Sequence, residues 1–214
     1  MSTTHIYLIR HGESEGNRVR AFLGHTDLDL TEKGHAQAEK TAEYLKDIHA
    51  DVIYSSDLKR AYSTACHTAK KKGMEIIKNK NLREIYAGEW ENRFFDDLAV
   101  EYADAFGIWK ENVGRARCTG GESVAELQTR FVTELKKIVK ENEGKNIFIF
   151  THATPIRVTK AAIDGVSLDE IKDIPWASNA SVTHIECNGE DLRVVDYSVD
   201  HFMEELLTVL PKTV

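Results

Sequence analysis

The chain is poor in cysteine and proline. The few cysteines argue against a disulfide-rich protein, and the few prolines argue against a Pro-rich linker between domains. Its three cysteines, Cys66, Cys118 and Cys187, lie far apart and form no C-x-x-C pair. An odd and dispersed set does not suit a disulfide framework, and it favours reduced thiols packed as small hydrophobic side chains. Only three prolines occur, and no Pro-rich or Gly/Ser-rich linker divides the sequence. We therefore expect a single domain over residues 1–214.

An excess of basic residues and long apolar segments are also missing. The chain has 28 Lys and Arg against 35 Asp and Glu, a net charge of −7, which argues against a nucleic-acid partner. No apolar run approaches the ~18 residues of a membrane span, and the first ten residues do not have the pattern of a signal peptide. We expect a cytoplasmic protein with no membrane partner. No feature of the sequence indicates an oligomeric state.

Short apolar runs alternate with amphipathic segments along the chain. Runs typical of buried strands occur at residues 5–9, 52–54, 75–78 and 146–151, and a hairpin is expected from 181–186 and 192–196 around Asn188-Gly189. Helices are expected at about 31–48, 58–72, 123–138, 156–163 and 201–210. This alternation predicts an α/β fold, a three-layer sandwich with a mostly parallel central sheet and helices on both faces.

Residues 90–118 interrupt the alternation. The stretch is rich in aromatic side chains, among them Trp90, Phe94, Phe95 and Trp109, and these follow no clean period. We interpret it as an aromatic-rich helical insertion at about 90–118. The rings either form the core of the inserted helices or line a pocket for an apolar or ring-bearing substrate.

Polar residues follow the predicted strands where ligands usually bind in such sheets, at the carboxyl ends. The three strand ends are Arg10-His11-Gly12, Ser55-Ser56-Asp57 and Thr151-His152-Ala153. Gly12 and Gly16 let the backbone approach a ligand closely. Arginine binds phosphate through its guanidinium fork, and a neutral imidazole is a nucleophile near pH 7. Together with a carboxylate as proton donor, such a set is suited to phosphoryl transfer without a metal.

The segment Leu8–Ser14, with the sequence LIRHGES, resembles the signature of the histidine phosphatase superfamily, which has the phosphoglycerate mutase-like fold. Five further segments resemble family blocks in the same order, and they are 30–34, 55–61, 82–91, 120–123 and 151–152. A lone R-H-G triplet would be a weak signal, whereas six ordered blocks over nearly the whole chain are a specific one.

The resemblance implies a catalytic set, which consists of His11, Arg10, Arg60, His152 and Glu84. His11 would become phosphohistidine, Glu84 would protonate the leaving oxygen, and the other three would hold the phosphoryl group. Water would then release phosphate. The partner implied is a small-molecule phosphomonoester, with no cofactor and no metal. Residues implied to border the substrate are Asn17, Leu23, Gly24 and Ala153.

Three departures from the family pattern bear on the reaction. The family often has glycine at the position of Ala153, and its mutases tend to have Ser or Thr at the position of Leu23. The chain also lacks the mutases' longer insertion for a second phosphate. We therefore expect phosphomonoester hydrolysis, with phosphoglycerate mutase-type transfer as the alternative.

Three other readings compete with this one. The run Gly12-Glu13-Ser14-Glu15-Gly16 matches the G-x-S-x-G elbow of serine esterases, but it follows only one strand. The nine histidines form neither H-x-H nor H-E-x-x-H, so we expect no metal site. A catalytically inactive phosphate-binding module is the third reading, and the intact catalytic set argues against it.

Overall fold

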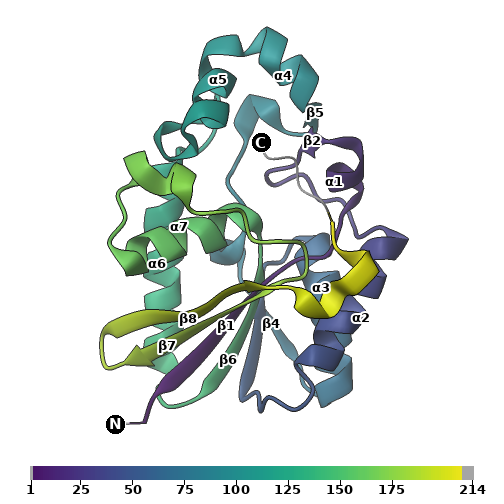
Figure 1. The fold of residues 1–214 in the computed structure, drawn as a ribbon, viewed down its shortest axis with the longest axis vertical. Helices are drawn as coiled ribbons and strands as arrows, with labels where there is room; N and C mark the ends of the chain where they lie inside the picture. The colour runs from purple at the N-terminus through teal and green to yellow at the C-terminus, as the bar shows by residue number, and fades with distance from the viewer. Residues whose placement is uncertain (1, 209–214) are drawn as a thin grey trace.

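A six-stranded sheet forms the centre of the molecule (Figure 1), in a computed structural model that describes residues 2–208. Its strands are β1 (Thr4–Arg10), β3 (Val52–Ser55), β4 (Ile76–Lys78), β6 (Asn146–Thr151), β7 (Val182–Asn188) and β8 (Asp191–Val199). The spatial order is β4-β3-β6-β1-β7-β8. The first four run parallel, and β7 is antiparallel to both of its neighbours. The predicted mostly parallel sheet and the hairpin are both confirmed.

Helices cover both faces of this sheet, as Figure 1 shows. One face carries α2 (Glu32–Tyr44) and α3 (Lys59–Lys72), and the other carries α6 (Val124–Glu141) and α7 (Ala153–Asp164). Side chains alternate between the faces along each strand. In β6, Phe148 therefore packs with Ala65 of α3, while Ile149 packs with Leu135 of α6. The result is the predicted three-layer sandwich.

The aromatic stretch that follows β4 forms a small helical unit above the sheet, at the top of Figure 1. Its elements are β5 (Arg93–Phe94), α4 (Phe95–Glu101) and α5 (Ala103–Glu111), and β5 pairs with β2 (Ala21–Phe22). Trp90 and Phe106 are buried in the core of this unit, with their rings edge to face at 5.5 Å. The unit thus packs its own aromatic cluster against the segment that follows β1.

The remaining elements are short. They are the helix α1 (Glu15–Val19) and the 3-10 helices η1 (Lys80–Leu82), η2 (Gly88–Trp90), η3 (Val113–Arg115), η4 (Leu168–Asp173) and η5 (His201–Leu206). Among residues 2–208, no helix has both the length and the apolar character needed to cross a membrane.

Several helix boundaries differ from the sequence prediction. α2 ends at Tyr44, because the Lys46 N–H bonds to Glu43 and tightens the last turn. α7 begins at Ala153 rather than at 156. Pro155 is tolerated in the first turn because the N–H that proline lacks would have no hydrogen-bond partner within the helix there. The expected tail helix is a 3-10 helix, η5, and positions 209 and 210 of that prediction lie outside the described residues.

Candidate active site

A cavity of about 270 Å³ opens beyond the carboxyl ends of β1, β3 and β6. The predicted residues that line it are Arg10, His11, Asn17, Leu23, Gly24, Arg60, Glu84 and Ala153. His152 lies behind this lining, fully buried, with its ring centroid 5.2 Å from that of His11. The structure therefore brings together all nine of the residues singled out for catalysis and substrate binding.

His11 follows the last residue of β1, and its surroundings fix the ring. Its backbone N–H donates to Thr151 of β6, and its carbonyl accepts from the Asn179 side chain. Nδ1 lies 2.6 Å from the Gly12 carbonyl oxygen, which can only accept, so Nδ1 carries the hydrogen. Burial, followed by the charges of Arg60 and Arg10, holds the pKa of His11 well below 6.5. The neutral ring thus keeps a lone pair on Nε2.

Arg10 and Arg60 bring two positive charges to the same cavity. They are 5% and 1% exposed, and neither has a carboxylate partner within 4.0 Å among residues 2–208. Burial lowers the pKa of each to about 10, so both stay charged near neutral pH. Buried charges are normally paired, because removing them from water is costly. Two such guanidinium groups around one cavity are suited to binding an anion.

The hydrogen bonds of Arg10 and Arg60 position their guanidinium groups but do not use all of the N–H donors. Arg60 donates through Nη1 to the Thr26 carbonyl at 2.8 Å and through Nη2 to the Gly24 carbonyl at 2.7 Å. Arg10 donates through Nη1 to the Ala177 carbonyl at 2.5 Å. Its Nε is buried and has no acceptor within the described chain. That unsatisfied N–H is available to an anionic ligand.

His152 is held by a serine from a neighbouring strand end. Its Nε2 lies 2.9 Å from the Ser56 hydroxyl oxygen, which also accepts from the backbone N–H of Leu58. The hydroxyl hydrogen can therefore point to Nε2, which leaves the ring hydrogen on Nδ1. That Nδ1 is buried and finds no partner among residues 2–208. Burial, then the charge of Arg60, holds the pKa of His152 well below 6.5. Sequence reasoning found the strand end but missed this serine.

Glu84 supplies the carboxylate of the cavity wall. Its Oε1 accepts from the Ile85 N–H at 2.8 Å, and its Oε2 accepts from the Thr154 N–H at 3.2 Å. Thr154 lies in the first turn of α7, so the helix N-terminus orients the carboxylate. His25 donates from its ring to the Glu84 carbonyl at 2.9 Å and holds the backbone. These bonds fix the half-buried Glu84 side chain in a position where it still lines the cavity.

The residues expected to border the substrate differ in what they offer. Asn17 accepts through Oδ1 from the Ser14 backbone and hydroxyl, so its amide nitrogen is the group left for a ligand. Leu23 and Ala153 present apolar groups. Gly24 has φ +50°, and a Cβ there would collide with the Glu91 carboxylate. Glu91 in turn accepts from the N–H groups of residues 25 and 26, a role that sequence reasoning did not find.

The interpretation of Gly12 as a close approach to a ligand is wrong. A Cβ on Gly12 would collide with the backbone carbonyl of Gly34, near the start of α2, and Gly12 does not line the cavity. Gly16 does line it, but a Cβ there would collide with the side chain of Leu23. Both glycines therefore serve close packing within the protein.

The rest of the cavity wall is largely aromatic. Its apolar side chains are those of Ala21, Phe22, Leu23, Ile85, Phe95, Trp109 and Trp176. Among the described residues, Arg20 is the one charged side chain of the lining beyond those already considered. Trp90 and Phe106, in contrast, are core only. Some rings of the aromatic stretch thus lie in the core, and others line the cavity. Phe22 and Trp176 lie far from that stretch in sequence, and no pattern indicated them.

The serine of the G-x-S-x-G run has a structural role. Ser14 is fully buried and caps α1, where its hydroxyl exchanges hydrogen bonds with Asn17. It is absent from the cavity lining. The structure gives Ser14 no histidine partner among the described residues, which argues against a serine esterase.

Known proteins resemble this chain over most of its length. The model of the histidine phosphatase superfamily (branch 1) matches residues 6–200. Phosphoserine phosphatase 1 of Hydrogenobacter thermophilus is 34% identical over 85% of this chain and 86% of its own. The metal-independent phosphoserine phosphatase of Arabidopsis thaliana is 31% identical over 87% and 85%.

A solved structure agrees with these relatives. Bacillus stearothermophilus YhfR superposes with a TM-score of 0.89 and 30% identity, over 93% of this chain and 99% of its own. The ordered blocks in the sequence, the three-layer fold and the cavity at the strand ends all lead to the same assignment. The chain therefore belongs to branch 1 of the histidine phosphatase superfamily.

Proposed function

We propose that this phosphatase hydrolyses small phosphate monoesters through a phosphohistidine on His11, with Glu84 as the acid and then the base. The observation that carries the proposal is the cavity itself, where two buried guanidinium groups without carboxylate partners in the described chain surround a neutral imidazole. A phosphoryl group satisfies both charges and offers the phosphorus atom to the nucleophile.

In the first step, Nε2 of His11 attacks phosphorus, an N–P bond forms, and the bond to the ester oxygen breaks. Arg10, Arg60 and the Nδ1–H of His152 compensate the charge on the three phosphoryl oxygens. The leaving oxygen takes a proton from the Glu84 carboxyl group. The alcohol then leaves, and a negatively charged phosphohistidine remains, surrounded by the same donors.

In the second step, water attacks the phosphohistidine from the side that the alcohol has vacated. The Glu84 carboxylate, now deprotonated, accepts a proton from that water. A P–O bond forms and the N–P bond breaks, so the electron pair returns to Nε2 of His11. Inorganic phosphate is released, and the carboxyl group is again protonated for the next cycle.

The alcohol part of the substrate is proposed to be apolar or to carry a ring. The rest of the wall carries four rings, those of Phe22, Phe95, Trp109 and Trp176, together with the charged Arg20. Such rings bury the apolar surface of a ring-bearing alcohol well. Leu23 packs against Gly16 and offers methyl groups where a hydroxyl would suit the carboxylate of phosphoglycerate. The cavity thus favours hydrolysis over mutase-type transfer.

Phosphate release from a library of phosphomonoesters tests the proposal. We expect p-nitrophenyl phosphate to be cleaved, with inhibition by vanadate, no loss in excess EDTA, and no cleavage of p-nitrophenyl acetate. Absence of turnover with every phosphomonoester would favour an inactive phosphate-binding module instead.

A matched pair of variants tests the apolar wall. Phe95→Ala removes a ring that lines the cavity, whereas Phe94→Ala removes its neighbour, which is 52% exposed and outside the lining. We expect Phe95→Ala to raise KM for ring-bearing substrates and to change kcat/KM little for small alkyl phosphates. Phe94→Ala should change neither. Equal effects on both substrate types would contradict the proposed role of the wall.

A further inference from the structure

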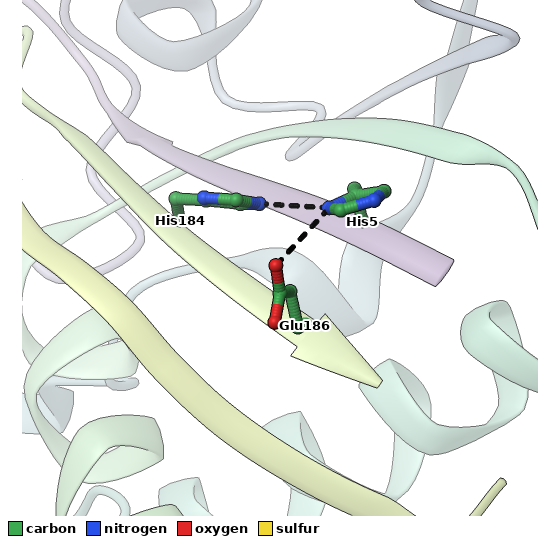
Figure 2. A group of neighbouring side chains, drawn as sticks. All are labelled: His5, His184 and Glu186. Atoms are coloured by element: carbon green, nitrogen blue, oxygen red, sulfur yellow. Dashed lines mark hydrogen bonds and ion pairs between the residues drawn. The ribbon is translucent and has the colours of Figure 1, made fainter. Parts of the chain in front are cut away.

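Two histidines and a glutamate converge at the end of the sheet opposite the active site. His5 lies near the start of β1, and His184 and Glu186 lie on the neighbouring strand β7. His5 pairs directly with Glu186, and Tyr7 pairs with His184, so these four side chains project from the same face of the sheet. Figure 2 shows the two imidazoles and the carboxylate pointing toward a common centre.

The donor atoms are spaced as the ligands of one small ion are spaced. Nδ1 of His5 lies 3.0 Å from Nε2 of His184 and 3.9 Å from Oε1 of Glu186. One ligand atom from each of the three residues fits within a span of 4.8 Å. A tetrahedral Zn²⁺ with bonds of about 2.05 Å separates its ligand atoms by about 3.3 Å. The two nitrogens are close to that spacing, and the Glu186 carboxylate, which is 3.9 Å from His5, has to move toward both of them.

Neighbouring side chains orient two of the three donors, Glu186 and His184. Arg193 donates to Oε2 of Glu186 at 2.7 Å, which leaves Oε1 for the centre of the cluster. The Tyr7 ring stacks on the His184 ring, with centroids 4.6 Å apart and planes within 4°. Asp196 lies 4.0 Å from Nδ1 of His184, the nitrogen that faces away from His5, which is beyond hydrogen-bonding distance.

We propose that His5, His184 and Glu186 form a binding site for a divalent transition-metal ion, Zn²⁺ in particular. Two imidazole nitrogens and one carboxylate oxygen suit Zn²⁺, whereas Ca²⁺ and Mg²⁺ prefer oxygen ligands alone. The side chains of His5, Glu186 and His184 are 33%, 23% and 17% exposed, so an ion reaches them from solvent and water can complete the coordination.

The site is structural rather than catalytic. Six residues of extended strand separate His5 from His11, a distance of about 20 Å, so the ion takes no part in the proposed phosphoryl transfer. It would instead connect the start of β1 to the end of β7. Sequence spacing did not reveal the site, because 179 positions separate the two histidines.

A second histidine pair in the same molecule provides a matched control. Nδ1 of His35 lies 3.2 Å from Nε2 of His67, much as in the proposed site. Its carboxylate, from Glu39, meets the other nitrogen of His67 and so does not converge on the pair. This pair lacks the third ligand on the shared side, and we expect it to bind Zn²⁺ far more weakly.

Zinc titration of the full-length, EDTA-treated protein against a chromogenic chelator tests the proposal. We expect one Zn²⁺ per chain, a rise in Tm with Zn²⁺, and a tetrahedral absorption spectrum when Co²⁺ replaces it. His184→Gln and Glu186→Gln should each weaken binding, the first by more than about 100-fold, and both should abolish the Tm rise. His67→Gln should bind as the wild type does.

Activity provides an independent measurement. The kcat/KM of wild type with or without EDTA, and of Glu186→Gln, should agree, because the site is remote from the cavity. Circular dichroism reports whether His184→Gln folds. If it does not fold, the variant Glu186→Gln still tests whether the cluster binds Zn²⁺. The proposal is overturned if the wild type binds no Zn²⁺ in excess metal, or if Zn²⁺ binding is undiminished in both His184→Gln and Glu186→Gln.

Discussion

Replacing Glu84 by glutamine should slow the enzyme by an amount that depends on the leaving group. Glutamine keeps the volume of the side chain, but its amide neither donates the acid proton nor accepts one from water. For an alkyl phosphate, loss of general acid catalysis is expected to lower kcat/KM by about 10²–10⁴-fold, or about 2.7–5.4 kcal/mol. A nitrophenolate leaves without protonation, so the loss for p-nitrophenyl phosphate should stay within about tenfold.

The structure also sets the expected cost in stability. The carboxylate accepts from two backbone N–H groups, those of Ile85 and Thr154. The amide oxygen can keep only one of these bonds, so the free energy of unfolding should fall by about 1 kcal/mol. For a chain of this size, that corresponds to about 2–4 °C in Tm. A much larger loss of stability would mean that the kinetic effect reports misfolding.

The assay compares kcat/KM for p-nitrophenyl phosphate and 2-phenylethyl phosphate, which both carry a ring. The matched control is Glu89→Gln, in the same segment, where an exposed carboxylate outside the cavity accepts from the Tyr102 hydroxyl. This variant should behave as the wild type with both substrates. An equal loss for the two esters in Glu84→Gln would refute the reasoning, because it would mean that Glu84 does not protonate the leaving oxygen.

Three further outcomes are expected. His11→Ala should reduce turnover to background, and wild type quenched during turnover should carry an acid-labile, base-stable phosphate that the variant lacks; trapped phosphate in the variant would exclude His11 as the nucleophile. Because the folded pKa values of His11 and His152 lie below the unfolded value of 6.5, the unfolded chain gains protons first on acidification. Urea titrations should therefore show stability falling below about pH 6.5, by up to about 1.4 kcal/mol per pH unit for each histidine, with a shallower slope in His152→Gln. Gly12→Ala should destabilise by about 1–3 kcal/mol through its collision with Gly34, whereas Gly107→Ala, whose Cβ meets nothing within 4 Å, should be neutral or stabilising by up to about 1 kcal/mol.

The sequence predicted the sheet and the histidines of the site for a simple reason. Strand order along the chain and the carboxyl-end rule place His11 and His152 at one edge of the sheet without knowledge of any side-chain contact. Arg60 and Glu84 came only from family resemblance, since a charged residue on a helix or a loop is usually solvated. What buries Arg60 is the backbone of residues 24–26, whose carbonyl oxygens accept its hydrogen bonds.

Other features depend on contacts between distant segments and leave no local pattern. Trp176 completes the aromatic wall beside Trp109, with the ring centroids 6.4 Å apart, although 67 positions separate them in sequence. α7 begins at Ala153, three residues before the predicted start, because Pro155 is compatible with the first turn of a helix. The convergence of His5 with His184 requires the β1–β7 register, which no short-range pattern provides.

The hydrogen bond from Nδ1 of His11 to the Gly12 carbonyl has a stereochemical consequence for the covalent intermediate. An imidazole ring has two nitrogens, and free histidine in solution forms isomers phosphorylated at either one. With Nδ1 committed to a backbone oxygen 2.6 Å away, the ring cannot flip to present that atom without losing the bond. The enzyme is therefore expected to make one regioisomer, the adduct on Nε2, so the backbone of the loop acts as a protecting group.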